Sequence, residues 1–175
     1  MRTSHDDAPQ NPARDAGGER HGEASASGDG DALRKRHLAR GRSAIDRATA
    51  MCRYAGIAED DAQVVPKDPT AKAANAVRLS AQALARLPEF PLDPAADARC
   101  ARNAAAAAAV VAKVAQSHAG AGDLSDVAYR AAIKASMTGG AAAGQAARGR
   151  DEALNRTADA DEAAAVAAAE AAGWM

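Results

Sequence analysis

The amino-acid sequence predicts an all-α protein, an alanine-rich helical bundle of five or six helices that follows a disordered N-terminal tail. Alanine, which has the highest intrinsic helix propensity, supplies 54 of the 175 residues. From residue 31 onward, apolar residues recur at spacings of three and four, and no segment shows the two-residue alternation of a strand. A chain of this length suits one domain. We therefore expect a tail at residues 1–30 and a single bundle domain at residues 31–175.

Large apolar side chains are scarce throughout the chain. Val, Ile, Leu and Phe together number 20, about 11% of the residues. Burial of an alanine methyl group stabilises a fold by only about 0.8 kcal/mol, against roughly 1.5–3 kcal/mol for a Leu or Val side chain. We therefore expect helices that form readily, pack closely against one another and give a fold of modest stability.

The predicted tail, residues 1–30, lacks the apolar surface that folding requires. Apart from Met1 it holds no apolar side chain larger than alanine, and it contains five glycines and two prolines. Such a composition predicts disorder. The segment also lacks the apolar core of a signal peptide, and the chain has only two cysteines, far apart in the sequence. These features indicate a cytoplasmic protein.

The first helix is expected to begin at Asp31, whose side chain can cap it, and to end at Gly56 in a left-handed conformation followed by Ile57. Its core-facing stripe follows spacings of three and four. The stripe consists of Leu38, Gly41, Ile45, Ala48, Met51, Cys52 and Ala55.

Two Asp-Pro pairs predict the starts of the next two helices, because aspartate caps a helix and proline suits its first position. One helix runs from Asp68-Pro69 to Leu87-Pro88, and the other runs from Asp93-Pro94 to about Ala119, with Gly120 as its end. The short link between them favours an antiparallel hairpin.

The last third of the chain gives weaker signals. A fourth helix is expected over about residues 124–138, capped within residues 123–126 and ended by Gly139-Gly140. Residues 141–156 have a helical composition interrupted by glycines, and a last helix is expected over residues 159–172. Beyond it, Trp174 is predicted to fold back onto the bundle and anchor the end of the chain, because an indole ring buries more apolar area than several alanines.

Charge is arranged in blocks. Residues 31–58 carry a net charge of +5, whereas residues 1–30 and 59–68 each carry −3. Within the first helix (residues 34–53) cations flank the apolar stripe on both sides. The candidate anion- or partner-binding residues are Arg36, Arg40 and Arg47 on one flank, and Lys35, Arg42 and Arg53 on the other. They can bind phosphate backbone, an acidic protein or a membrane surface, or they can lie along the core edge and be neutralised by the two acidic segments.

For the remaining candidate residues, their positions in the sequence indicate structural roles. His118 lies in the last turn of its helix, where a cation interacts well with the helix dipole. Cys52 and Cys100 fall on core stripes and are expected to be buried, with a redox-controlled crosslink between their helices as the alternative. Glu162, on the last helix, is expected to be an ordinary surface residue. We expect no metal or cofactor, since the sequence contains no phosphate-binding loop, zinc motif or nucleophile motif.

These observations favour a non-catalytic cytoplasmic protein that acts through protein–protein interaction. The alternative is an anion- or nucleic-acid-binding protein that uses the Arg-rich first helix. Four aromatic residues are too few for a base-stacking platform, and no run of 18 apolar residues could span a membrane. Two further alternatives are that the chain self-associates, and that it is an enzyme whose catalytic residues come together only in the folded structure.

Overall fold

The computed structural model of the chain describes residues 20–120 and 122–175, with side chains from residue 28 onward. These residues form five α-helices and two short 3₁₀ turns, which confirms the all-α bundle that the sequence predicts. The helices are α1 (Arg20–Tyr54), α2 (Pro69–Arg86), α3 (Pro94–Ala119), α4 (Asp123–Ala143) and α5 (Glu152–Ala171), and the turns are η1 (Glu59–Asp61) and η2 (Leu87–Glu89). Over this part of the chain, none of the helices combines the length and the apolar character that crossing a membrane requires.

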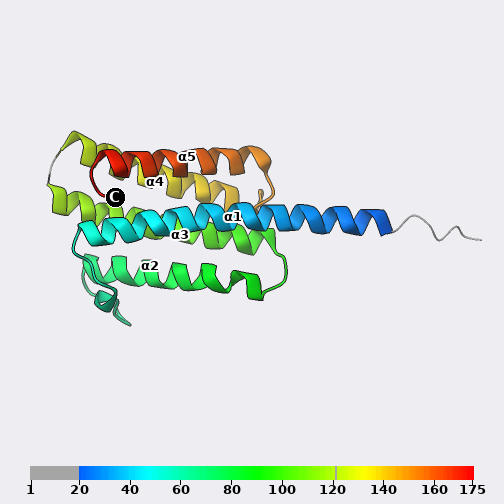
Figure 1. The fold of residues 1–175 in the computed structure, drawn as a ribbon, viewed down its shortest axis with the longest axis horizontal. Coiled ribbons are helices and arrows are strands. Elements are labelled where there is room, and N and C mark those ends of the chain that lie inside the picture. Colours follow the sequence, from blue (N-terminus) through cyan, green and yellow to red (C-terminus); the bar gives the residue numbers. More distant parts are fainter. Residues whose placement is uncertain (1–19, 121) are drawn as a thin grey trace, which may run out of the picture.

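Helices α1 and α3 form the middle of the bundle (Figure 1). Helix α2 packs against both of them on one side, while α5 contacts α1 and α4 contacts α3 on the other. Successive helices alternate in direction, so α1, α3 and α5 run parallel to one another. The first turns of α1 extend past the end of the other helices (Figure 1).

The start of α1 differs from the prediction. The helix begins at Arg20, so Asp31 does not cap it. Gly30 is buried, and a Cβ atom at this position would lie 3.4 Å from Cδ1 of Leu92 in the link between α2 and α3. This tertiary contact extends the helix upstream of the local cap signal. Residues 1–19 of the predicted tail lie outside the described residues.

The Asp-Pro starts of α2 and α3 are confirmed. The Asp68 side chain accepts a hydrogen bond from the backbone N–H of Ala71 at 2.8 Å. The Asp93 side chain accepts one from Ala95 at 3.0 Å. In both helices proline holds the first position, where its missing N–H costs nothing.

The predicted end of α1 is also confirmed. Gly56 adopts a left-handed φ of 69°. The N–H of Ile57 donates to the carbonyl of Cys52 at 2.8 Å, and the Ile57 side chain is buried. This is the bonding pattern and apolar contact of a glycine-ended helix. The apolar stripe is confirmed as well, since its seven residues, six in the helix and Ala55 just after it, are buried or half-buried.

The predicted end of α4 at Gly139-Gly140 is wrong, because the helix continues to Ala143. Gly139 is buried against α3, where an added Cβ atom would lie 3.8 Å from Cα of Arg102 and 3.9 Å from Cβ of Ala105. The glycine therefore serves close helix packing rather than termination.

Helix α5 begins earlier than predicted, at Glu152 instead of residue 159. The Asp151 side chain caps it by accepting from the N–H of Leu154 at 2.9 Å. The preceding segment turns through Gly149, whose φ is 72°. A Cβ atom at Gly149 would overlap the carbonyl oxygen of Pro94, so only glycine fits this approach to α3.

Small residues set the spacing of the core. Most of the buried residues of α3 are alanines. Val111 is the one buried valine, leucine or isoleucine of this helix. Gly41 of α1 lies so close to α2 that an added Cβ atom would be 2.7 Å from Cδ2 of Leu84. The helices thus approach closely, as the alanine content predicts.

The prediction that Trp174 packs on the bundle is confirmed. Gly173 has a left-handed φ of 72°, and the N–H of Trp174 donates to the carbonyl of Ala169 at 2.9 Å. The indole is only 1% exposed and lies 6.2 Å, centroid to centroid, from the ring of Tyr54 at the end of α1. This contact ties the end of α5 to the end of α1.

We expect Trp174→Ala to lower the free energy of unfolding by about 3–5 kcal/mol, because it removes the largest fully buried side chain and leaves a cavity. Urea denaturation followed by circular dichroism measures the change. Phe90→Ala, at an aromatic residue that is 53% exposed, is the control and should change stability much less. Equal effects of the two substitutions would contradict the role of Trp174 as an anchor.

Candidate functional site

The six cations proposed from the sequence divide into two groups in the structure. Lys35, Arg42 and Arg53 are exposed, and Arg53 lies at the edge of α1 toward α2. Arg36, Arg40 and Arg47 face α5 and pair with its carboxylates. We call the polar contact between α1 and α5 the α1–α5 seam. Its members are Arg36, His37, Arg40, Ser43 and Arg47 of α1, and Glu152, Asn155, Asp159 and Glu162 of α5, with Gly149 just before α5.

The most buried part of the seam is the ion pair between Arg47 and Glu162. Nε and Nη2 of Arg47 donate to the two carboxylate oxygens of Glu162 at 3.1 Å and 2.8 Å. The exposed fractions of the two side chains are 0% and 4%. Ser43 Oγ donates a third hydrogen bond to the same carboxylate at 3.3 Å. Two charges are therefore removed from water and satisfied mainly by each other.

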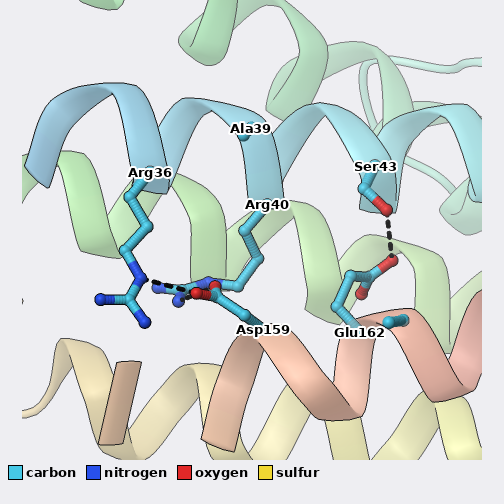
Figure 2. Close-up of a pocket in the computed structure, with 7 residues that line it drawn as sticks. Arg36, Ala39, Arg40, Ser43, Asp159 and Glu162 are labelled. Carbon is cyan, nitrogen blue, oxygen red and sulfur yellow. Dashed lines mark hydrogen bonds and ion pairs between the residues drawn. The ribbon is translucent and has the colours of Figure 1, made fainter. Parts of the chain in front are cut away.

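Two arginines share one carboxylate farther along the seam. Figure 2 shows Arg36 and Arg40 reaching from α1 to Asp159 of α5. Arg36 Nε and Arg40 Nη1 donate to its two oxygens at 2.6 Å and 2.7 Å. Arg36 also contacts Glu152 at 2.6 Å. Burial alone would lower the pKa of Arg36, but its hydrogen bonds to these carboxylates outweigh burial and raise the pKa.

His37 connects the seam to the segment before α5. Its Nε2 lies 3.0 Å from the carbonyl oxygen of Gly149, and its Nδ1 lies 3.0 Å from Nη2 of Arg40. A guanidinium only donates, so Nδ1 accepts and the proton is on Nε2. Burial and the nearby Arg40 charge lower the pKa of His37, which keeps the ring neutral. Asn155 Nδ2 donates to the same Gly149 oxygen at 2.9 Å.

A second interhelical ion pair fixes α1 against α3. Arg34 donates to both carboxylate oxygens of Asp97, at 2.9 Å and 3.1 Å, and to the carbonyls of Phe90 and Pro91. The hydrogen bond to Asp97 raises the pKa of Arg34. Asp97 itself is completely buried. Arg34, which the sequence analysis did not single out, therefore positions the start of α3 and the link before it.

The ion pairs and hydrogen bonds of the α1–α5 seam hold the two helices together. A small groove of about 250 Å³ opens along the seam, lined by the residues drawn in Figure 2. Both carboxylates in this groove, those of Asp159 and Glu162, accept hydrogen bonds from arginines of α1. Within the described part of the chain, no group of three His, Cys, Asp or Glu side chains could hold a metal ion.

The carboxylates that neutralise these arginines were not the ones expected. The sequence suggested the acidic segments 1–30 and 59–68, whereas the partners observed are on α5. The expectation that Glu162 is an ordinary surface residue is wrong, because Glu162 is buried against Arg47. A signal was present in the spacing of the two sets. Positions 36, 40, 43 and 47 on α1 and positions 152, 155, 159 and 162 on α5 both advance by three or four residues.

The two cysteines are free thiols. Cys52 is buried, as predicted, and burial raises the pKa of its thiol to about 11. Cys100 is half-buried, and burial together with the nearby Asp97 raises its pKa as well. Both thiols are protonated at neutral pH and are poor nucleophiles.

Comparison of the chain with known protein families, with curated proteins and with solved structures finds no match.

Breaking the buried ion pair should be costly. We expect Arg47→Met to lower the free energy of unfolding by about 3–5 kcal/mol, because Glu162 then keeps a buried charge without its guanidinium. The double variant Arg47→Met/Glu162→Leu should recover most of this loss. Urea denaturation of the single and double variants gives the coupling energy. The control is Arg86→Ala in the exposed pair with Glu89, where we expect a change below about 1 kcal/mol. A similarly small change for Arg47→Met would contradict the conclusion that the Arg47–Glu162 ion pair holds α1 and α5 together.

The neutral state of His37 predicts a pH dependence of stability. The pKa of His37 is lowered in the fold, so below about pH 6.5 the unfolded chain takes up a proton that the folded chain does not. The free energy of unfolding should fall as the pH drops below 6.5, by up to about 1.4 kcal/mol per pH unit. His37→Gln should flatten this dependence, whereas His118→Gln, at an exposed histidine, should not. Denaturation curves between pH 5 and 7.5 test this, and parallel curves for wild type and His37→Gln would contradict it.

Proposed function

We propose that this protein is a non-catalytic interaction module that binds an acidic, amphipathic helix of a partner protein through the outward face of α4. The observation that carries the proposal is a row of exposed apolar and basic side chains along this helix. We call this row the α4 ridge. It consists of Leu124, Val127, Arg130, Ile133, Lys134 and Met137.

The α4 ridge exposes more large apolar side chains than any other described helix. Four of its six residues are apolar, and Met137, the most exposed of them, is 69% accessible. Apart from the adjacent pair Ile133 and Lys134, successive ridge residues are three positions apart and so follow one another along the helix surface. Helix α4 packs on α3 and α5 with its opposite face. An apolar strip of this kind suits an amphipathic helix as its partner.

The charge of the ridge favours an acidic partner. Beyond its first turn, α4 carries Arg130 and Lys134 and no aspartate or glutamate, whereas both of its acidic residues, Asp123 and Asp126, lie in that first turn. Arg130 is exposed. Lys134 contacts Asp161 of α5 at 2.9 Å but remains 69% exposed. A partner helix with leucine-type residues on one face and carboxylates beside them would match both features.

Two further features support a non-catalytic protein in the cytoplasm. In the α1–α5 seam the carboxylates are bound by arginines, which suits a structural role. The free thiols of Cys52 and Cys100 suit a reducing compartment.

The α4 ridge can be tested by site-specific photo-crosslinking. A photoreactive amino acid replaces Met137 in the full chain, and the same amino acid replaces Val64 as a control. Val64 is an exposed apolar residue too, but it lies in the segment between α1 and α2. When the cells that express these variants are irradiated, we expect the photoreactive group at position 137 to crosslink a partner protein and the one at position 64 not to. Arg130→Glu should reduce this capture at least about tenfold, because it reverses the charge at the centre of the ridge.

Other outcomes identify other functions. Equal capture at both positions, or a captured segment without an acidic amphipathic helix, would refute the proposal. A crosslinked copy of the same chain would indicate self-association. Nucleic-acid binding through the first helix now depends on Lys35, Arg42 and Arg53, the exposed half of the original six cations. Retention on a nucleic-acid column at low salt, lost when these three residues are changed to glutamine, would support that alternative instead.

A further inference from the structure

We infer that a cleft between α1 and α2 is a binding site for a small amphipathic carboxylate, a molecule with an apolar body and one carboxylate group. This α1–α2 cleft is separate from the α4 ridge and is independent of the function proposed there. Its volume is about 440 Å³, within the range usual for ligand pockets. Its lining residues come from α1, from the segment around η1, and from α2.

The cleft exists because small residues of α2 leave space that α1 does not fill. Near one end of α2, Leu84 packs directly on Gly41 and closes the gap between the helices. One turn before Leu84, and again farther toward the start of α2, the helix presents Ala81 and Ala74, whose methyl groups are too short to do the same. The two antiparallel helices are thus in tight contact at Leu84 and separated by an open space over the turns of α2 that precede it.

The floor of the cleft is apolar. Cys52, Ile57 and Ala74 are buried there, and Ile45 and Val77 are half-buried. The Cys52 thiol is protonated at neutral pH because its pKa is about 11, so it adds no charge. An apolar ligand body would remove this surface from water, which stabilises a complex by about 25 cal/mol per Å².

The rim of the cleft carries two arginines on facing helices, Arg53 of α1 and Arg78 of α2. Among the described residues, no carboxylate forms an ion pair with either guanidinium; Arg78 donates only to the side-chain amide of Asn75, at 2.7 Å. Both are exposed and therefore available to an anion. Glu59, also on the rim, leaves a net charge of +1 there, which matches a single carboxylate.

Together the floor and the rim select one class of ligand. Inorganic phosphate would leave the apolar floor unused, and an apolar molecule without a charge would leave the guanidinium groups without a partner. A medium-chain fatty acid or an aromatic acid satisfies both, because a guanidinium binds a carboxylate through two hydrogen bonds in its own plane.

The test is a titration of the full chain with octanoate, compared with octylammonium, which has the same chain length and the opposite charge. Methyl NMR spectra of protein labelled at alanine report the site. We expect octanoate to shift the methyl signals of Ala74 and Ala81 and to bind at least tenfold more tightly than octylammonium.

Matched variants distinguish binding by the two rim arginines from nonspecific attraction to the positive charge of α1. Arg53→Gln and Arg78→Gln should each weaken octanoate binding about tenfold, and Ala81→Leu should weaken it by filling the cleft. Arg42→Gln removes an exposed cation of α1 that does not line the cleft and should leave the affinity unchanged. All of these side chains are exposed or half-buried, so the variants are expected to fold, which circular dichroism checks. Equal affinity for the two ions, methyl shifts elsewhere in the bundle, or wild-type affinity of the Arg53→Gln/Arg78→Gln double variant would each overturn the inference.

Discussion

The buried ion pair between Arg47 and Glu162 sets the register of the bundle. Alanine-lined helices can slide against one another with little change in buried apolar area, because one methyl group resembles the next. A buried guanidinium does not tolerate such sliding, since any shift of α5 would leave both charges without their partner. The shared carboxylate of Asp159 and the His37 contact to Gly149 repeat this constraint nearer the start of α1. In this protein these polar contacts thus act together with the contact of the C-terminal tryptophan and the close approach at Gly149 in fixing how α5 and the segment before it lie on α1 and α3.

Alanine and glycine give the bundle both its close contacts and its open surfaces. Where glycine faces a larger residue, as Gly41 faces Leu84, the helix axes approach closely. Where Ala74 and Ala81 of α2 face the half-buried Ile45 of α1, space remains, and the α1–α2 cleft is the result. The chain has few large apolar residues, and four of them lie on the α4 ridge. Their position on an outward face instead of in the core favours a binding surface there.

The sequence predicted those features of the fold that depend on neighbouring residues. The caps at Asp68 and Asp93, the left-handed turn at Gly56 and the return of Trp174 all follow from short motifs, and all are present. The errors occur where a distant contact overrides the local signal. Gly139 allows α4 to approach α3 instead of ending the helix. The α1–α5 seam escaped prediction for the same reason, since its two halves are about 115 residues apart and only their matched spacing connects them.

The sequence separation of Arg47 and Glu162 also affects the order in which the protein can assemble. During synthesis the chain emerges from its N-terminal side, and α5 is the last of the described helices to leave the ribosome. Until then α1 has no carboxylates from α5, and its arginines remain hydrated rather than buried. Helices α1 to α4 can pack on one another before then, but the arginine side of α1 stays open until α5 is available. Completion of the α1–α5 seam is therefore a late event that follows translation of α5.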